Sequence, residues 1–204
     1  MRMTVMATTV AALTFALGAG SASAGVVTVA GTAGPWDTGL NPTFGYSDDG
    51  AQTAATTVAI TAGDKARIQY VSGSTTTDGN LLFTADANGY CCLVGPGFNA
   101  PGQYTPTVPA LMELIGAFTD ASGKIVGGPF VVGDGPAFAR APVGASFLSL
   151  GVNDNLYHDN TGALQIAVTT GVPEPAAWAM MLIGLAGIGG VLRSARRERA
   201  SAAA

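Results

Sequence analysis

Short runs of β-forming residues recur through residues 25–171, and two of them show a period of two. Residues 65–71 and 163–168 alternate large apolar with small or polar side chains, as half-buried β-strands do. Gly, Pro, Asp and Asn separate these runs, and no interior segment keeps a helical period over ten residues. The pattern predicts one all-β domain over residues 25–171, an antiparallel β-sandwich or jelly roll of about eight strands. The expected strands are 26–30, 56–60, 65–71, 81–84, 111–118, 130–132, 145–152 and 164–169.

The first 24 residues have the pattern of a secretory signal peptide. Arg2 supplies the positive start, an apolar stretch runs from about Val5 to Leu17, and Ala22–Ala24 fits the small-residue cleavage pattern. A retained N-terminal anchor is the alternative, but it would not require this small-residue exit. We therefore expect export through the inner membrane by the general secretion machinery, with cleavage by signal peptidase.

A second targeting segment lies at residues 172–199. Pro173-Glu174-Pro175 precedes a charge-free apolar run at 176–192, whose 17 residues are the short limit for a helix that crosses a membrane. By the positive-inside rule, the basic cluster after the run leaves residues 200–204 as a cytoplasmic tail and the domain on the outer side. The cluster consists of Arg193, Arg196, Arg197 and Arg199.

These residues resemble a known sorting signal. Pro173, Glu174, Pro175 and Trp178, with the apolar run and Arg193, Arg196 and Arg197 behind them, are similar to the PEP-CTERM signal in its PEPxxWA variety. The resemblance implies an exopolysaccharide-producing Gram-negative bacterium, with cleavage at the motif by an exosortase. The protein would be anchored transiently and then reach the cell surface or extracellular matrix. A plain anchor is the alternative, but it does not require Pro-Glu-Pro.

The domain between the two signals is acidic. It carries four basic residues against eleven carboxylates, a net charge of −7. Such a surface repels phosphate backbones, so we expect no nucleic-acid partner. Carboxylate oxygens in an exported domain suit a hard cation such as calcium. The basic residues are Lys65, Arg67, Lys124 and Arg140.

The two cysteines, Cys91 and Cys92, are adjacent. Their Cα atoms can be only about 3.8 Å apart, which is below the usual disulfide range. A strained vicinal disulfide, two thiols and an intermolecular link all stay open, whereas a Cys-x-x-Cys site is excluded. Residues 91–109 are rich in Gly and Pro and are expected to form a long surface loop.

The segment 153–160 is the strongest candidate site. Asp154, Asp159 and Asn160 can supply side-chain oxygens from one tight loop, and calcium binds six to eight oxygens at about 2.3–2.6 Å. The alternative is an Asn/Asp-rich hairpin whose side chains satisfy its own turns. His158 is the only histidine, and no nucleophile motif accompanies it, so we predict no catalytic residue.

Parts of the domain resemble the PA-IL-like family, the calcium-dependent galactophilic lectins and their relatives. The most specific parts lie between residues 145 and 166. The similar segments are Phe138–Pro142, Leu148–Asp154 and Asp159–Leu164, with Pro35–Gly39, Leu114–Gly116 and Pro129–Gly133.

The resemblance implies a role for each matched residue. At the Asp154 position the family binds calcium and sugar together, and Asp159 and Asn160 would complete the cation site with a backbone carbonyl, here of Tyr157 or His158. Asn155 and Asp159 would touch the sugar. Two departures weaken galactose specificity: the loop is shorter than in the lectins, and Asp159 stands where Asn is expected. The sugar-contacting residues of an earlier loop have no clear counterpart; Asp86 and Asn88 are the nearest candidates.

Three function classes follow. The first is a calcium-dependent carbohydrate-binding module for a galactoside or matrix polysaccharide. The second is a structural matrix or biofilm protein without sugar binding. The third, a polysaccharide hydrolase, is the weakest, because the sequence shows no pair of carboxylates placed for glycoside hydrolysis. We therefore expect no enzymatic activity. Trp36 would either stack on a sugar or, in the favoured interpretation, cover one end of the sandwich.

Overall fold

The structure is a computed structural model that describes residues 23–45, 49–77, 84–90, 109–171, 181–190 and 193. The chain divides into a compact unit, Ser21–Pro173, and a second unit made of its two ends. Several sequence predictions lie outside the described residues. They are nearly all of the signal peptide, most of the strand at 81–84, Cys91 and Cys92, and Pro173, Glu174, Pro175, Trp178, Arg196 and Arg197.

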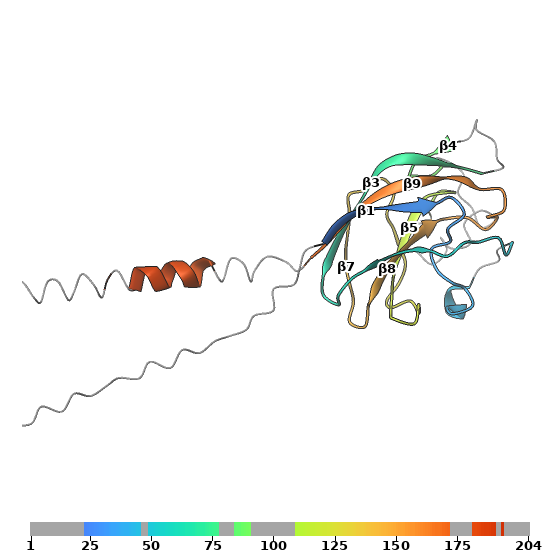
Figure 1. The fold of residues 1–204 in the computed structure, drawn as a ribbon. Coiled ribbons are helices and arrows are strands. Elements are labelled where there is room, and N and C mark those ends of the chain that lie inside the picture. Colours follow the sequence, from blue (N-terminus) through green and yellow to red (C-terminus); the bar gives the residue numbers. More distant parts are fainter. Residues whose placement is uncertain are drawn as a thin grey trace, which may run out of the picture. The chain divides into compact units, whose positions relative to one another are not determined.

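Nine strands in the described residues form two antiparallel sheets, which confirms the all-β prediction (Figure 1). The five-stranded sheet has the order β1-β9-β3-β4, and β7 also pairs with β3. Its strands are β1 (Ser23–Ala30), β3 (Lys65–Thr76), β4 (Thr84–Ala85), β7 (Ala137–Arg140) and β9 (Thr161–Gly171).

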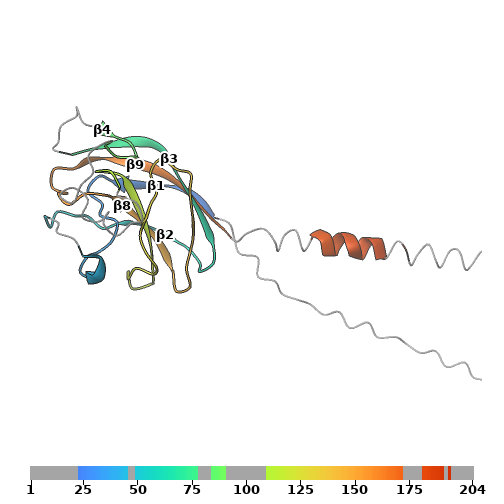
Figure 2. The same ribbon diagram turned by 180° about the vertical axis from the view of Figure 1, so that it is seen from behind.

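The four-stranded sheet has the order β2-β8-β5-β6, and Figure 2 shows β2 and β8 from behind. Its strands are β2 (Thr56–Ala59), β5 (Leu114–Thr119), β6 (Phe130–Val131) and β8 (Phe147–Val152). A short 3-10 helix, η1 (Pro42–Phe44), lies in the segment between β1 and β2.

The core lies between the two sheets. Alternation along β3 turns Ala66 and Ile68 inward, and β9 contributes Leu164 and Ile166 in the same way. The four-stranded sheet opposes them with side chains such as Leu148. Each fully buried Leu or Ile stabilises the fold by about 1.5–3 kcal/mol relative to an exposed one. The alternation read from the sequence therefore assigns these side chains to the correct face.

Strand β5 is buried on both faces because the chain before β2 covers the outer side of its sheet. Trp36, only 1% exposed, packs there on Ile115 and Ala117. Its Nε1 donates to the carbonyl of Phe44 over 2.9 Å. The ring therefore covers the sheet and has no open face on which a sugar could stack.

Some strand bounds differ from the prediction. Strand β5 begins at Leu114 rather than at residue 111, because Met112 has a left-handed φ of 63° that no strand accommodates. Strand β7 was not predicted, and its four residues are too few to show a period in the sequence. Strand β3 continues to Thr76, five residues further than expected, through an irregularity between Tyr70 and Ser72.

In the second unit, residues 181–190 are helical and exposed. Over the part of the chain that the structure describes, no helix is both long and apolar enough to cross a membrane.

Candidate functional site

The candidate loop, residues 153–160, joins β8 to β9 and is fixed at its start. The Asn153 amide donates to the Glu113 carbonyl over 2.9 Å, and the Asn153 side chain donates to the Ala110 carbonyl over 2.8 Å. Tyr157 is fully buried, and its hydroxyl donates to the Val152 carbonyl over 3.1 Å. The loop is therefore folded back on the end of β8.

Asp154 is buried, with 2% of its surface exposed. Its Oδ1 accepts hydrogen bonds from the amides of Asn155 (2.6 Å) and Leu156 (3.1 Å). Its Oδ2 is buried and accepts no hydrogen bond from the described residues. Burial raises the pKa of Asp154, the two amides and the nearby Asn160 side chain oppose this, and the charge of Asp159 raises it further.

Asn160 presents a second buried oxygen in the same loop. Its Nδ2 donates to the Gly31 carbonyl over 3.0 Å, which fixes the orientation of the amide. Its Oδ1 is buried without a hydrogen-bond partner among the described residues. The Asn160 amide reaches the Tyr157 carbonyl over a long 3.3 Å, so that carbonyl belongs to the same turn. Asp159 Oδ1 is buried as well.

This set of oxygens fits a hard cation. A buried carboxylate oxygen without a partner is costly unless a proton or a metal ion compensates it. The loop offers two carboxylates, one carboxamide and a backbone carbonyl, which are the ligand types that calcium prefers. No group of three or more His, Cys, Asp or Glu that could hold a metal occurs within the described ranges. Further calcium ligands would therefore be amide, carbonyl or water oxygens.

Asp49, which the sequence analysis did not single out, holds the loop from outside. Its Oδ1 accepts the Tyr157 amide over 3.1 Å and its Oδ2 accepts the His158 amide over 2.8 Å. The same Oδ2 forms a close ion pair with Nδ1 of His158. Burial acts to raise the pKa of Asp49, but the hydrogen bonds from His158 and from two further amides lower it to about 2.

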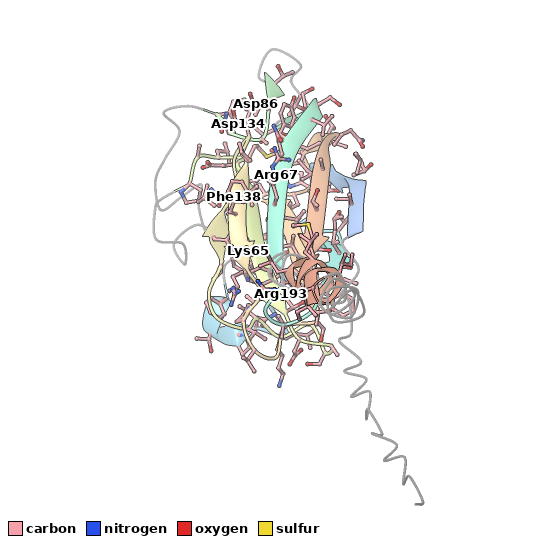
Figure 3. All side chains as sticks on the ribbon, turned by 90° about the vertical axis from the view of Figure 1, so that its left-hand side faces the viewer. Lys65, Arg67, Asp86, Asp134, Phe138 and Arg193 are labelled. Atoms are coloured by element: carbon pink, nitrogen blue, oxygen red, sulfur yellow. The ribbon has the colours of Figure 1, made fainter. Side chains whose placement is uncertain are left out.

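Asp86 and Asn88, the further sugar-site candidates, lie in a different turn. Asp86 Oδ1 accepts the Asn88 amide over 2.8 Å, and Asn88 Oδ1 accepts the Asp134 amide over 3.0 Å. Figure 3 shows Asp86 and Asp134 close together at one end of the molecule. The described contacts thus bring these residues to Asp134 and not to Asp154. Their role in sugar binding stays a prediction, as does that of the half-buried Asn155.

Glu113 lies between the two turns. Its carbonyl accepts the Asn153 amide, and a Cβ on Gly133 would lie 2.9 Å from Asn88 Oδ1 and 3.5 Å from Glu113 Oε1. Burial raises the pKa of Glu113, although the Ala110 amide donates to its Oε2 over 2.7 Å and lowers it in part. Glu113 therefore supports the start of the candidate loop through its backbone.

Comparison with known proteins identifies the tail. Residues 171–197 match the family model described as the PEP-CTERM protein-sorting motif. The match confirms the predicted sorting signal, and it marks an exported protein that is sorted and processed by an exosortase. No curated protein and no solved structure matches the chain. The resemblance of the domain to the PA-IL-like lectins stays a prediction.

Proposed function

We propose that the exported domain is a calcium-dependent carbohydrate-binding module of the cell surface or extracellular matrix, without enzymatic activity. The observation that carries the proposal is the pair of buried oxygens, Asp154 Oδ2 and Asn160 Oδ1, that have no hydrogen-bond partner among the described residues. Both belong to one loop of eight residues between two core strands.

Calcium would be held by Asp154, Asp159 and Asn160, with the Tyr157 carbonyl as a further ligand. A bound cation would offset the mutual repulsion of the two carboxylates and would supply open coordination positions for vicinal sugar hydroxyls. Asp154 would bind the cation through Oδ2, while its Oδ1 fixes the turn by accepting hydrogen bonds from the amides of Asn155 and Leu156. Asn155 and Asp159 are the loop residues that would meet the sugar.

A structural matrix protein that uses calcium for stability alone is the second candidate. The contacts that favour it are those of Asp49, because they fix the loop whether or not a ligand is bound. The two functions differ in one property: only the carbohydrate-binding module retains a sugar.

Retention on galactose and glucan resins tests the proposal. We expect the calcium-loaded exported protein to be retained on at least one resin and released by a chelator. Asp154→Asn should lose both retention and the calcium-induced rise in melting temperature. Asp134→Asn is the matched control, because it removes one exposed carboxylate from outside the loop. A calcium-induced rise without retention on any sugar would select the structural candidate. If calcium neither raises the melting temperature nor promotes retention on a sugar, the cation site is absent.

A further inference from the structure

The outer face of the five-stranded sheet carries a cluster of basic side chains. Lys65 of β3 pairs with Arg140 of β7, and Arg67 pairs with Phe138. Paired residues point to the same side of a sheet, as do residues two apart on one strand. Because the intervening Ala66 is fully buried, these four side chains point outward. We call Lys65, Arg67, Phe138 and Arg140 the basic face; Figure 3 shows three of them on one side of the molecule.

The cations of the basic face have no carboxylate partner in the described part of the chain. Over those residues the ion pair found within 4.0 Å joins His158 to Asp49. Arg67 donates to the Gln69 side chain, which is neutral. Asp64 precedes Lys65, but its Oδ2 accepts the amide of Thr61 over 3.2 Å.

This placement does not serve the stability of the fold. Lys65 and Arg140 lie directly opposite each other on neighbouring strands, and like charges in that position are destabilising. The domain has eleven carboxylates with which its four basic residues could pair, yet three of the four are gathered here. An anionic ligand would account for cations that repel one another and have no carboxylate partner among the described residues.

An aromatic ring lies within the cluster. Phe138 is 70% exposed, on the strand next to Arg67. The neighbours of Arg67 across the sheet are small: Thr169 of β9 pairs with it, and Ala24 of β1 pairs with Thr169. Beside Phe138 and Arg140, a cavity of about 400 Å³ opens against Phe118 and Phe130. The basic face is therefore an open surface with one exposed aromatic ring, Phe138.

We propose that the basic face binds an anionic polysaccharide, with its carboxylates on Lys65, Arg67 and Arg140 and one sugar ring stacked on Phe138. Each pyranose ring of a polyuronate carries one carboxylate, so neighbouring sugars can place carboxylates on the cations while one ring lies on Phe138 beside Arg67. The net charge of −7 opposes any polyanion, but it opposes nucleic acid more strongly, because a duplex carries one charge per about 1.7 Å whereas an acidic polysaccharide carries one carboxylate per sugar. A single exposed ring is a small anchor for a lipid surface.

The basic face is separate from the candidate calcium loop. Lys65 pairs with Gly171 at the last position of β9, whereas the loop ends where β9 begins at Thr161. The two sites thus lie at opposite ends of one strand of 11 residues. Binding to the basic face requires no calcium, so this inference and the proposed function can fail independently.

Binding of the exported protein to polygalacturonate and to neutral dextran, both in chelator, tests the inference. We expect binding to polygalacturonate alone, weakening as the salt concentration rises. Arg67→Glu should weaken it at least about tenfold, or ~1.4 kcal/mol. Phe138→Ala should weaken it with little change in the salt dependence. Lys124→Glu makes the same charge change in the turn from Asp120 to Lys124, beside Asn41 and outside the basic face, and should leave binding unchanged. Unchanged melting temperatures establish that the variants fold.

Four results would overturn the inference. Equal binding to dextran would remove the role of the carboxylates. An equal effect of Lys124→Glu would show that only net charge matters. Polygalacturonate binding that occurs in calcium but is absent in chelator would assign that binding to the calcium loop. Preference for phosphatidylglycerol vesicles over polygalacturonate would identify the face as a membrane contact.

Discussion

The Asp49 carboxylate binds both the backbone amide and the imidazole of His158, 109 positions further along the chain. The Asp49 side chain is 14% exposed and the His158 side chain is 64% exposed, so the pair closes over the loop from the solvent side. With the Tyr157 amide also bound to Asp49, two successive amides of the candidate loop are fixed by a carboxylate from a distant segment. The geometry of the loop therefore depends on a residue that lies outside it.

The titration of His158 reports this contact. The side-chain hydrogen bond that His158 donates to Asp49 raises the pKa of His158 above 6.5, so the stabilising contact is complete at lower pH and is lost as the pH rises through the folded-state value. We expect Asp49→Asn to lower the pKa of His158 toward 6.5 in an NMR titration. Asp120→Asn, in a separate hairpin, should leave it unchanged. The same His158 pKa in wild type and Asp49→Asn would refute the contact.

Acid should weaken the hold of Asp49 on the loop. The folded-state pKa of about 2 lies below the ordinary value of 3.8, so the stability that the carboxylate adds is present above pH 3.8 and is lost as the pH falls through about 2. Urea unfolding should show wild type more stable than Asp49→Asn at pH 6. The difference should shrink as the pH falls toward 2. A difference that stays constant with pH would mean that the charge of Asp49 plays no part.

Gly151 should resist substitution. A Cβ at this position would lie 2.4 Å from the Pro35 nitrogen, because the chain that covers the four-stranded sheet passes directly over β8. Backbone atoms cannot give way cheaply, so Gly151→Ala should cost about 1–3 kcal/mol of unfolding free energy. Gly128→Ala is the matched control, because a Cβ there would meet no atom within 4 Å. Equal denaturation midpoints for the two variants would contradict the close approach.

The period of two could be read from the sequence because one face of each strand is buried. Ile68 and Leu164 alternate with exposed or half-buried neighbours, and that signal is local. Strand β7 gave no such signal, since four residues hold two alternations at most. Its pairing with β3 is a long-range contact. The basic face could not be predicted from the sequence for the same reason, because only the pairing of β3 with β7 brings Phe138 beside Arg67.

The candidate site was predictable in part. Asp154 and Asn160 are near in sequence, so a shared loop follows from the spacing. Their burial could not be read from the sequence, because it depends on Gly31 and on the buried ring of Tyr157. Asp49 was missed because Asp48-Asp49-Gly50 has the composition of an ordinary turn, and only the fold brings it to His158.

Calcium should stabilise the domain in a manner that depends on pH through Asp154. At a calcium concentration about 100 times the dissociation constant, the gain is about 2.7 kcal/mol, which corresponds to a rise of roughly 5–10 °C in melting temperature. In chelator, the raised pKa of Asp154 means that its protonated form favours the fold. That contribution is complete below pH 3.8 and is lost as the pH rises through the folded-state value. Protons and calcium thus compete for one carboxylate.

The calcium-induced rise in melting temperature should therefore grow as the pH increases through the folded-state pKa of Asp154. Scanning calorimetry of the exported protein over a series of pH values from 3.8 to neutral, with calcium and with chelator, measures it directly. Asp154→Asn should show little rise at any pH, because the carboxamide carries no charge, while Asp134→Asn should behave as wild type. A calcium-induced rise in Asp154→Asn as large as that of wild type would place calcium elsewhere.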